Sequence, residues 1–158
     1  AITNDMRYII SGSDDKKLKV WQLAEPTSLE NNRIEEGNLC VAVFPKIYKS
    51  NSNNSALTNP IHRANNSLEI SKDDQYIIVG SADHTTDLIT FYPDDIQKST
   101  IYTYDSVHKS RVVCAVISES GRYTASCGED FAIKLVDNSR RNVVHTFNEP
   151  HGGNKHIS

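Results

Sequence analysis

The chain has 158 residues, with 17 Lys and Arg against 20 Asp and Glu, which gives a formal charge of −3. This length corresponds to one domain. The nearly balanced charge excludes a polycation built to grip nucleic acid or anionic lipid. The longest apolar runs, 39–44 and 112–117, are far shorter than the roughly 20 residues that span a bilayer.

Three cysteines, Cys40, Cys114 and Cys127, cannot all pair within the chain. An odd and sparse set of cysteines is typical of a reducing compartment, so we expect a cytoplasmic protein. The sequence leaves a nuclear or cytoskeletal location open. We expect Cys114 and Cys127 to be small buried apolar residues.

Three stretches, 5–21, 74–91 and 121–136, share one pattern. Each has a polar turn, a β-prone run led by Tyr, a small-residue turn that ends in Asp, and an alternating β-prone run. The second stretch is predicted to carry two extra residues between its turn Asp and Leu88. The turn aspartates are Asp15, Asp83 and Asp130, which are 68 and 47 residues apart.

A second marker, His62, His108 and His151, is spaced by 46 and 43 residues. No segment keeps an apolar period of 3.6 residues, and several short segments favour strands. Short strands in a repeat of this length indicate an all-β propeller with one four-stranded blade per repeat. The predicted repeats cover about 1–46, 62–105 and 108–148, with the start of a further repeat at 151–158 and an Asn-rich insertion at about 47–61.

The three stretches resemble the WD-repeat family of β-propellers. Segments 11–22 and 126–137 are similar to the family's strand b, turn and strand c, and His108 is similar to the His of its opening Gly-His dipeptide. The family's Trp position is assigned to Trp21, Phe91 and Val136. Its strand-b Ser position is assigned to Ser11, Val79 and Ser126.

The resemblance implies that His108, Ser126 and Asp130 form a structural hydrogen-bonded network. Ser11, Asp15, Trp21 and Asp83 hold the corresponding places in the other repeats. A His, a Ser and an Asp also make up a nucleophilic triad. In the family these groups satisfy one another inside a blade, so we expect no catalytic residue.

The chain starts and stops at the same point of the repeat and holds about three repeats. A closed propeller needs four to eight blades. We therefore expect about three four-stranded blades of a seven-bladed ring. The rest of the ring is expected from a longer chain or from another polypeptide.

The resemblance implies a non-catalytic scaffold that binds other proteins in a larger assembly, with no cofactor, metal, membrane or small-molecule substrate. His145, His151 and His156 match no compact metal-site spacing. Candidate partner-binding residues flank or follow the turn Asp, where family members engage ligands: Lys16, Lys17, His84, Thr85 and Phe131. The alternative is a component of a ribonucleoprotein or ribosome-assembly complex that contacts RNA through one basic spot formed by Lys109, Arg111, Arg140 and Arg141.

Overall fold

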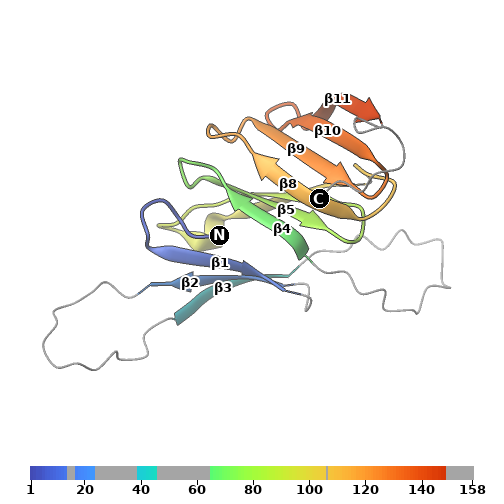
Figure 1. The fold of residues 1–158 in the computed structure, drawn as a ribbon. Coiled ribbons are helices and arrows are strands. Elements are labelled where there is room, and N and C mark those ends of the chain that lie inside the picture. The colour runs from blue at the N-terminus through green and yellow to red at the C-terminus, as the bar shows by residue number, and fades with distance from the viewer. Residues whose placement is uncertain (14–16, 24–38, 46–64, 106, 149–158) are drawn as a thin grey trace, which may run out of the picture.

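The computed structural model describes residues 1–13, 17–23, 39–45, 65–105 and 107–148. These residues form three antiparallel sheets that follow one another along the chain and lie side by side (Figure 1). They contain no helix with the length and apolar character of a membrane span. The first sheet consists of β1 (Tyr8–Gly12), β2 (Lys17–Gln22) and β3 (Leu39–Pro45). The second consists of β4 (Asn65–Ile70), β5 (Tyr76–Ser81), β6 (Thr86–Thr90) and β7 (Thr100–Tyr104), with a short 3-10 helix, η1 (Ile96–Lys98), between the last two. The third consists of β8 (Val112–Ile117), β9 (Tyr123–Gly128), β10 (Ala132–Asp137) and β11 (Asn142–Asn148).

The predicted all-β class is confirmed, and the second and third sheets have the predicted four strands in sequential order. In the first sheet the described residues provide three full strands. Beside β1, where a fourth strand would lie, the described chain makes one isolated β-bridge, between Ile2 and Ile9.

The central hairpin has the same length in all three sheets. Tyr8 pairs with Gln22, Tyr76 with Thr90, and Tyr123 with Asp137, so the paired residues are always 14 apart. The predicted insertion of two residues in the second hairpin is therefore wrong. The spacing of Leu88 and Phe91 matches that of Leu18 and Trp21 in the sequence, but Thr86 takes the place of Leu18 in the sheet.

The register also corrects the assignment of the Trp position. Trp21 pairs with Ile9, and the equivalent pair in the second sheet is Ile89 with Ile77. Ile89, not Phe91, is therefore at the Trp position. Phe91 lies just beyond β6, where its buried ring makes an edge-to-face contact with Tyr8 at 5.9 Å between centroids.

The turn before each Tyr-led strand is built in one way. The hydroxyls of Thr3, Ser71 and Ser118 each accept a hydrogen bond of 3.0 Å from the backbone N–H of the Tyr five residues later. In each turn the residue two positions before the Tyr has a left-handed backbone conformation. The φ angles of Met6, Asp74 and Gly121 are 58°, 58° and 69°. We call the end of the sheets that carries turns 3–7, 71–75 and 118–122 the Tyr-turn end. The opposite end, which carries the turns after β1, β5 and β9, is the Asp-turn end.

The second sheet buries both of its faces. Ile77, Val79 and Ile89 pack against Tyr8, Ile10, Leu18 and Val20 of the first sheet. Ile78 and Leu88 pack against Val112, Ala115 and Val136 of the third. A strand buried on both faces is apolar without alternation, as in the run Ile77–Val79.

Side-chain acceptors tie neighbouring sheets together at their edges. Asp74 of the second sheet accepts hydrogen bonds from the backbone N–H of Asn4 (2.8 Å) and Asp5 (3.2 Å). Towards the third sheet, the Ser67 hydroxyl accepts from the N–H of Ala115 at 2.8 Å. The carboxylate of Glu69 accepts from the N–H of Ile117 at 2.6 Å. The sheets are thus joined by hydrogen bonds as well as by apolar packing.

The cysteine prediction is wrong. Cys114 is exposed and Cys127 is only half-buried. The two are paired across β8 and β9, on the face of the third sheet opposite to the buried Val112 and Ala115. Which residues of β8 are buried depends on which face of the strand packs against the second sheet. A Cys within a β-prone run of the sequence does not show which face that is.

Replacement of Gly121 by Ala tests how closely the third sheet's Tyr-turn approaches the second sheet. A Cβ at Gly121 would lie 2.1 Å from Cδ2 of Tyr76, and its φ of 69° is unfavourable for Ala. Backbone strain and overpacking together are expected to lower the free energy of unfolding by about 2–4 kcal/mol. Chemical denaturation measures this change, with the exposed Ser120→Ala in the same turn as the control. Equal stability of the two variants would contradict the close contact.

Candidate functional site

The turn aspartates hold the turns at the Asp-turn end. Asp83 accepts hydrogen bonds from the hydroxyl (2.6 Å) and the backbone N–H (3.4 Å) of Thr85. Asp130 accepts from the N–H of Ala132 at 3.3 Å and, through its other oxygen, from the N–H of Lys109 at 2.8 Å. In both turns the carboxylate caps the residue two positions later, which is the Asx-turn geometry. Asp15 lies outside the described residues.

The structure brings His108, Ser126 and Asp130 together. The Nδ1 of His108 is 2.9 Å from a carboxylate oxygen of Asp130, and its Nε2 is 2.9 Å from the Ser126 hydroxyl. Because an ionised carboxylate only accepts hydrogen bonds, the proton is assigned to Nδ1 and the Ser126 hydroxyl donates to Nε2. Gly128 leaves room for the ring, since a Cβ there would lie 2.7 Å from Nδ1.

This arrangement has the order of a catalytic triad without access to a substrate. His108 and Ser126 are 1% and 2% exposed, at the contact between the second and third sheets. Burial raises the pKa of Asp130, but the hydrogen bonds from Lys109 and His108 outweigh it and hold that pKa below its ordinary value. The trio therefore satisfies buried polar groups and fixes the Asp turn to the connection before β8.

The other two sheets fill the same positions differently. In the first sheet the indole N–H of Trp21 donates to the Ser11 hydroxyl at 2.9 Å. In the second sheet Val79 and Ile89 hold the Ser and Trp positions, and both are fully buried. In the third, the small buried Val136 replaces Trp, so Ser126 bonds to His108 alone among these positions.

The predicted partner-binding residues that the structure describes lie at the Asp-turn end. His84 and Phe131 occupy equivalent left-handed positions after Asp83 and Asp130, with φ of 73° and 59°. His84 is exposed, and its carbonyl accepts the N–H of His108 at 3.4 Å. Thr85 is half-buried, Phe131 is half-buried and Lys17 is exposed at the start of β2. Lys16 lies outside the described residues.

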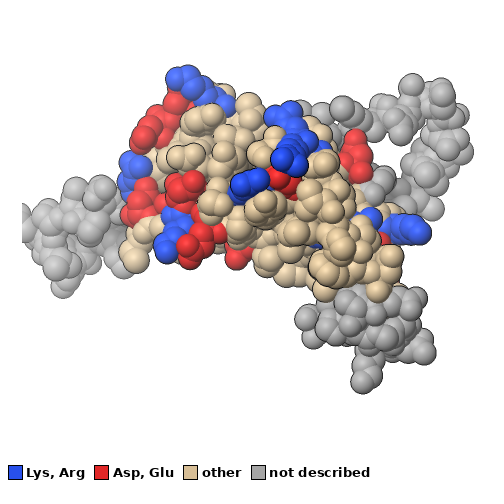
Figure 2. Space-filling view, turned by 90° about the horizontal axis from the view of Figure 1, so that it is seen from above, with Lys and Arg blue, Asp and Glu red and all other residues tan. Residues whose placement is uncertain are grey.

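The four basic residues proposed for RNA do not form one spot. Lys109 and Arg111 are at the Asp-turn end, where Arg111 is 3.6 Å from Glu129. Arg140 and Arg141 are in the turn between β10 and β11, at the Tyr-turn end. A strand of six residues separates the two pairs by about 20 Å. From the side of the third sheet, basic and acidic side chains intermingle without a continuous basic field (Figure 2).

The histidines near the C-terminal end of the sequence form no metal site among the residues that the structure describes. His145 lies in β11 with its ring 4.3 Å from that of Phe147. His151 and His156 are outside the described residues. Among the residues that the structure places, no three metal-ligating side chains gather.

Sequence reasoning missed a second buried polar cluster between the second and third sheets. The Tyr104 hydroxyl donates to the side-chain oxygen of Asn138 at 3.0 Å, and the Asn138 amide donates to the carbonyl of Gly121 at 2.7 Å. The same amide also donates to the Thr124 hydroxyl at 2.9 Å. Burial is the main cause that raises the pKa of Tyr104 to about 12. The partners come from different repeats and match no motif, so the sequence carried no signal for them.

Two stretches of the chain are similar in sequence to a known protein family. Residues 1–22 and 98–137 match the family model of the WD domain, G-beta repeat. The chain contains WD repeats. Its fold is similar to the crystal structure of the RRP9 WD40 repeats, with a TM-score of 0.64 and 17% identity over 94% of this chain. The WD repeats described here span 37% of that chain. A search of curated proteins by sequence gives no match.

Replacement of Asp130 by Ala tests the structural role of the trio. The change leaves the buried His108 ring and the Lys109 N–H without their acceptor, which is expected to lower the free energy of unfolding by about 1–3 kcal/mol. Thermal or urea denaturation measures the loss, and the exposed Asp105→Ala is the control. A melting curve unchanged by Asp130→Ala would show that the trio does not stabilise the blade.

The pH dependence of stability gives an independent check. A folded-state pKa below the unfolded value means that the Asp130 contribution is complete above about pH 4 and is lost as the pH falls through the folded value. The stability difference between wild type and Asp130→Asn should therefore stay constant from pH 7 to about pH 5 and shrink in more acidic solution. A difference that grows on acidification would contradict the ionised, hydrogen-bonded carboxylate.

Proposed function

We propose that the protein is a non-catalytic scaffold that binds other proteins through its Asp-turn end, as a subunit of a larger assembly. The WD-repeat fold supports a binding role, although a fold alone does not determine function. The burial of Ser126 and His108 supports a structural role for the His108, Ser126 and Asp130 cluster. A cytoplasmic location remains part of the proposal and rests on the odd number of cysteines.

The observation that carries the proposal is the set of side chains at one repeated turn position. The residue after the turn Asp is His84 in the second sheet and Phe131 in the third, and Lys16 holds the same sequence position in the first repeat. The equal hairpins place His84 and Phe131 at corresponding points of neighbouring sheets. The two neighbouring sheets thus carry an imidazole and an aromatic ring at the same turn position.

The backbone conformation at this turn position is energetically unfavourable for a large side chain. A left-handed backbone is unfavourable for a bulky residue such as Phe131, whereas Gly or Asn adopts it readily. Strained positions of this kind cluster at functional sites. We infer that the ring and the imidazole contribute to contacts with a partner, because two neighbouring Asp turns both carry a ring where Asn or Gly would adopt the left-handed conformation readily.

The variant His84→Asn/Phe131→Asn tests this proposal. Asn tolerates the left-handed conformation, so the free energy of unfolding should stay within about 1 kcal/mol of wild type. Affinity capture from the cells of origin, quantified by mass spectrometry, should lose the proteins held by the Asp-turn end.

The matched control is Met6→Asn. Met6 is also a left-handed, apolar residue and is 73% exposed, but it lies at the Tyr-turn end. Capture by this control should equal that of wild type. If the double variant captures the same proteins in the same amounts, the proposed surface is wrong.

A further inference from the structure

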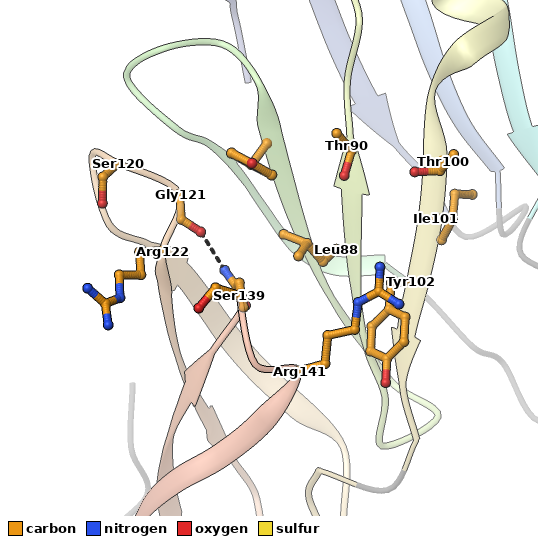
Figure 3. Close-up of a pocket in the computed structure, with 12 residues that line it drawn as sticks. Leu88, Thr90, Thr100, Ile101, Tyr102, Ser120, Gly121, Arg122, Ser139 and Arg141 are labelled. Atoms are coloured by element: carbon orange, nitrogen blue, oxygen red, sulfur yellow. Dashed lines mark hydrogen bonds between the residues drawn. The ribbon is translucent and has the colours of Figure 1, made fainter.

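A groove runs between the second and third sheets at the Tyr-turn end. Its volume of about 910 Å³ is at the upper end of the range for ligand sites. One wall is formed by strands β6 and β7, and the other by the turns before β9 and after β10 (Figure 3). Tyr76, packed against Gly121, fixes the distance between the walls. The groove is therefore a built feature of the sheet contact.

Arg141 extends across this groove to the ring of Tyr102 (Figure 3), with its guanidinium carbon 4.4 Å from the ring centroid. The residue is left-handed, with φ of 55°. Among the described residues, no carboxylate lies within ion-pair distance of Arg141. The two neighbouring arginines differ, since Arg122 and Arg140 lie 3.7 and 3.9 Å from Asp137. Arg141 thus holds a positioned positive charge that nothing in the described chain neutralises.

Apart from Arg122, which lies 3.7 Å from Asp137, the remaining groove lining is uncharged and mixed. Leu88 and Ile101 supply apolar surface, and Thr90, Thr100 and Ser120 supply hydroxyls. No Asp or Glu lines the groove. In addition, the groove is lined by β7, which is the outermost strand of its sheet among the described residues. An elongated cleft with apolar patches, hydrogen-bonding groups and one unpaired guanidinium is complementary to an extended peptide that carries an anionic side chain.

We propose that this groove binds an acidic segment of a partner protein, with Arg141 as the residue that binds its anionic group. RNA is a poorer match. Single-stranded RNA needs open aromatic faces for its bases and several unpaired cations for its phosphates. Here Arg141 already covers the Tyr102 ring, and Arg122 and Arg140 both lie within ion-pair distance of Asp137. The inference rests on the proposed scaffold function only in taking a protein as partner, because the groove lies at the opposite end from His84 and Phe131.

A phage-displayed library of 12-residue peptides, selected on the immobilised protein, provides the probe. The enriched peptides should carry Asp or Glu at a fixed position. For a fluorescent synthetic copy of such a peptide, Arg141→Ala should weaken binding by about 10- to 100-fold, the value of a hydrogen-bonded charge pair. Arg141→Lys should restore part of the loss, because it keeps the charge.

Arg140→Ala is the matched control. It removes the adjacent arginine, which faces Asp137, and should leave the affinity unchanged. Binding should also persist in His84→Asn/Phe131→Asn, so that failure at the Asp-turn end and failure at the groove can be told apart. A version of the peptide with phosphoserine in place of the acidic residue distinguishes a phosphorylated partner, if it binds more tightly, from a carboxylate-bearing one.

Three results would overturn the proposal. The first is a selection that enriches no acidic peptide. The second is an affinity that Arg141→Ala does not change while circular dichroism shows an intact fold. The third is binding of a 12-nucleotide oligouridine that depends on Arg141 and exceeds that of every selected peptide, which would assign the groove to RNA.

Discussion

The structure depends on one constraint, the common register of its three central hairpins. In a strand, neighbouring side chains point to opposite faces, so a slip by one residue would exchange the two faces of a sheet. The second sheet cannot tolerate such a change, because it packs against a sheet on each side. The hydroxyl-capped turns before Tyr8, Tyr76 and Tyr123 fix one end of each hairpin. Asp83 and Asp130 hold the other end in the second and third sheets. Equal hairpins then place equivalent turns at equivalent points, which creates the two distinct ends of the molecule.

Polar and apolar side chains solve the same packing problem in different repeats. His108, Ser126 and Asp130 form a satisfied polar network, whereas Val79 and Ile89 fill the corresponding Ser and Trp positions with aliphatic groups. Both solutions leave no polar side chain of these positions without a partner. This interchangeability supports an architectural role for the network, since an apolar pair could not replace reactive groups. It also leaves the turn ends free to differ in side chains without a change in the sheets.

Much of the fold could be predicted from the sequence because its signals are local. Turn aspartates, Tyr-led strands and the His–Ser pair lie at short, repeated spacings, and they predicted the all-β class and the WD-repeat resemblance. The register of the second hairpin was predicted wrongly because Phe91 is aromatic like Trp21, whereas Ile89, which holds the Trp position in the sheet, is aliphatic. The buried Tyr104–Asn138 contact and the groove at Arg141 depend on which faces meet between repeats, which no local pattern encodes. For the same reason the four basic residues looked like one spot in the sequence and lie at two ends in space.

The register of the second hairpin tests this account most directly. NMR measurement of cross-strand contacts between backbone protons should place Ile77 opposite Ile89 and Val79 opposite Asp87. This result would establish three equal hairpins and, with them, the two ends on which the functional proposals rest. Contacts that instead place Ile77 opposite Phe91, with two residues looped out after Asp83, would contradict the common register and the account built on it.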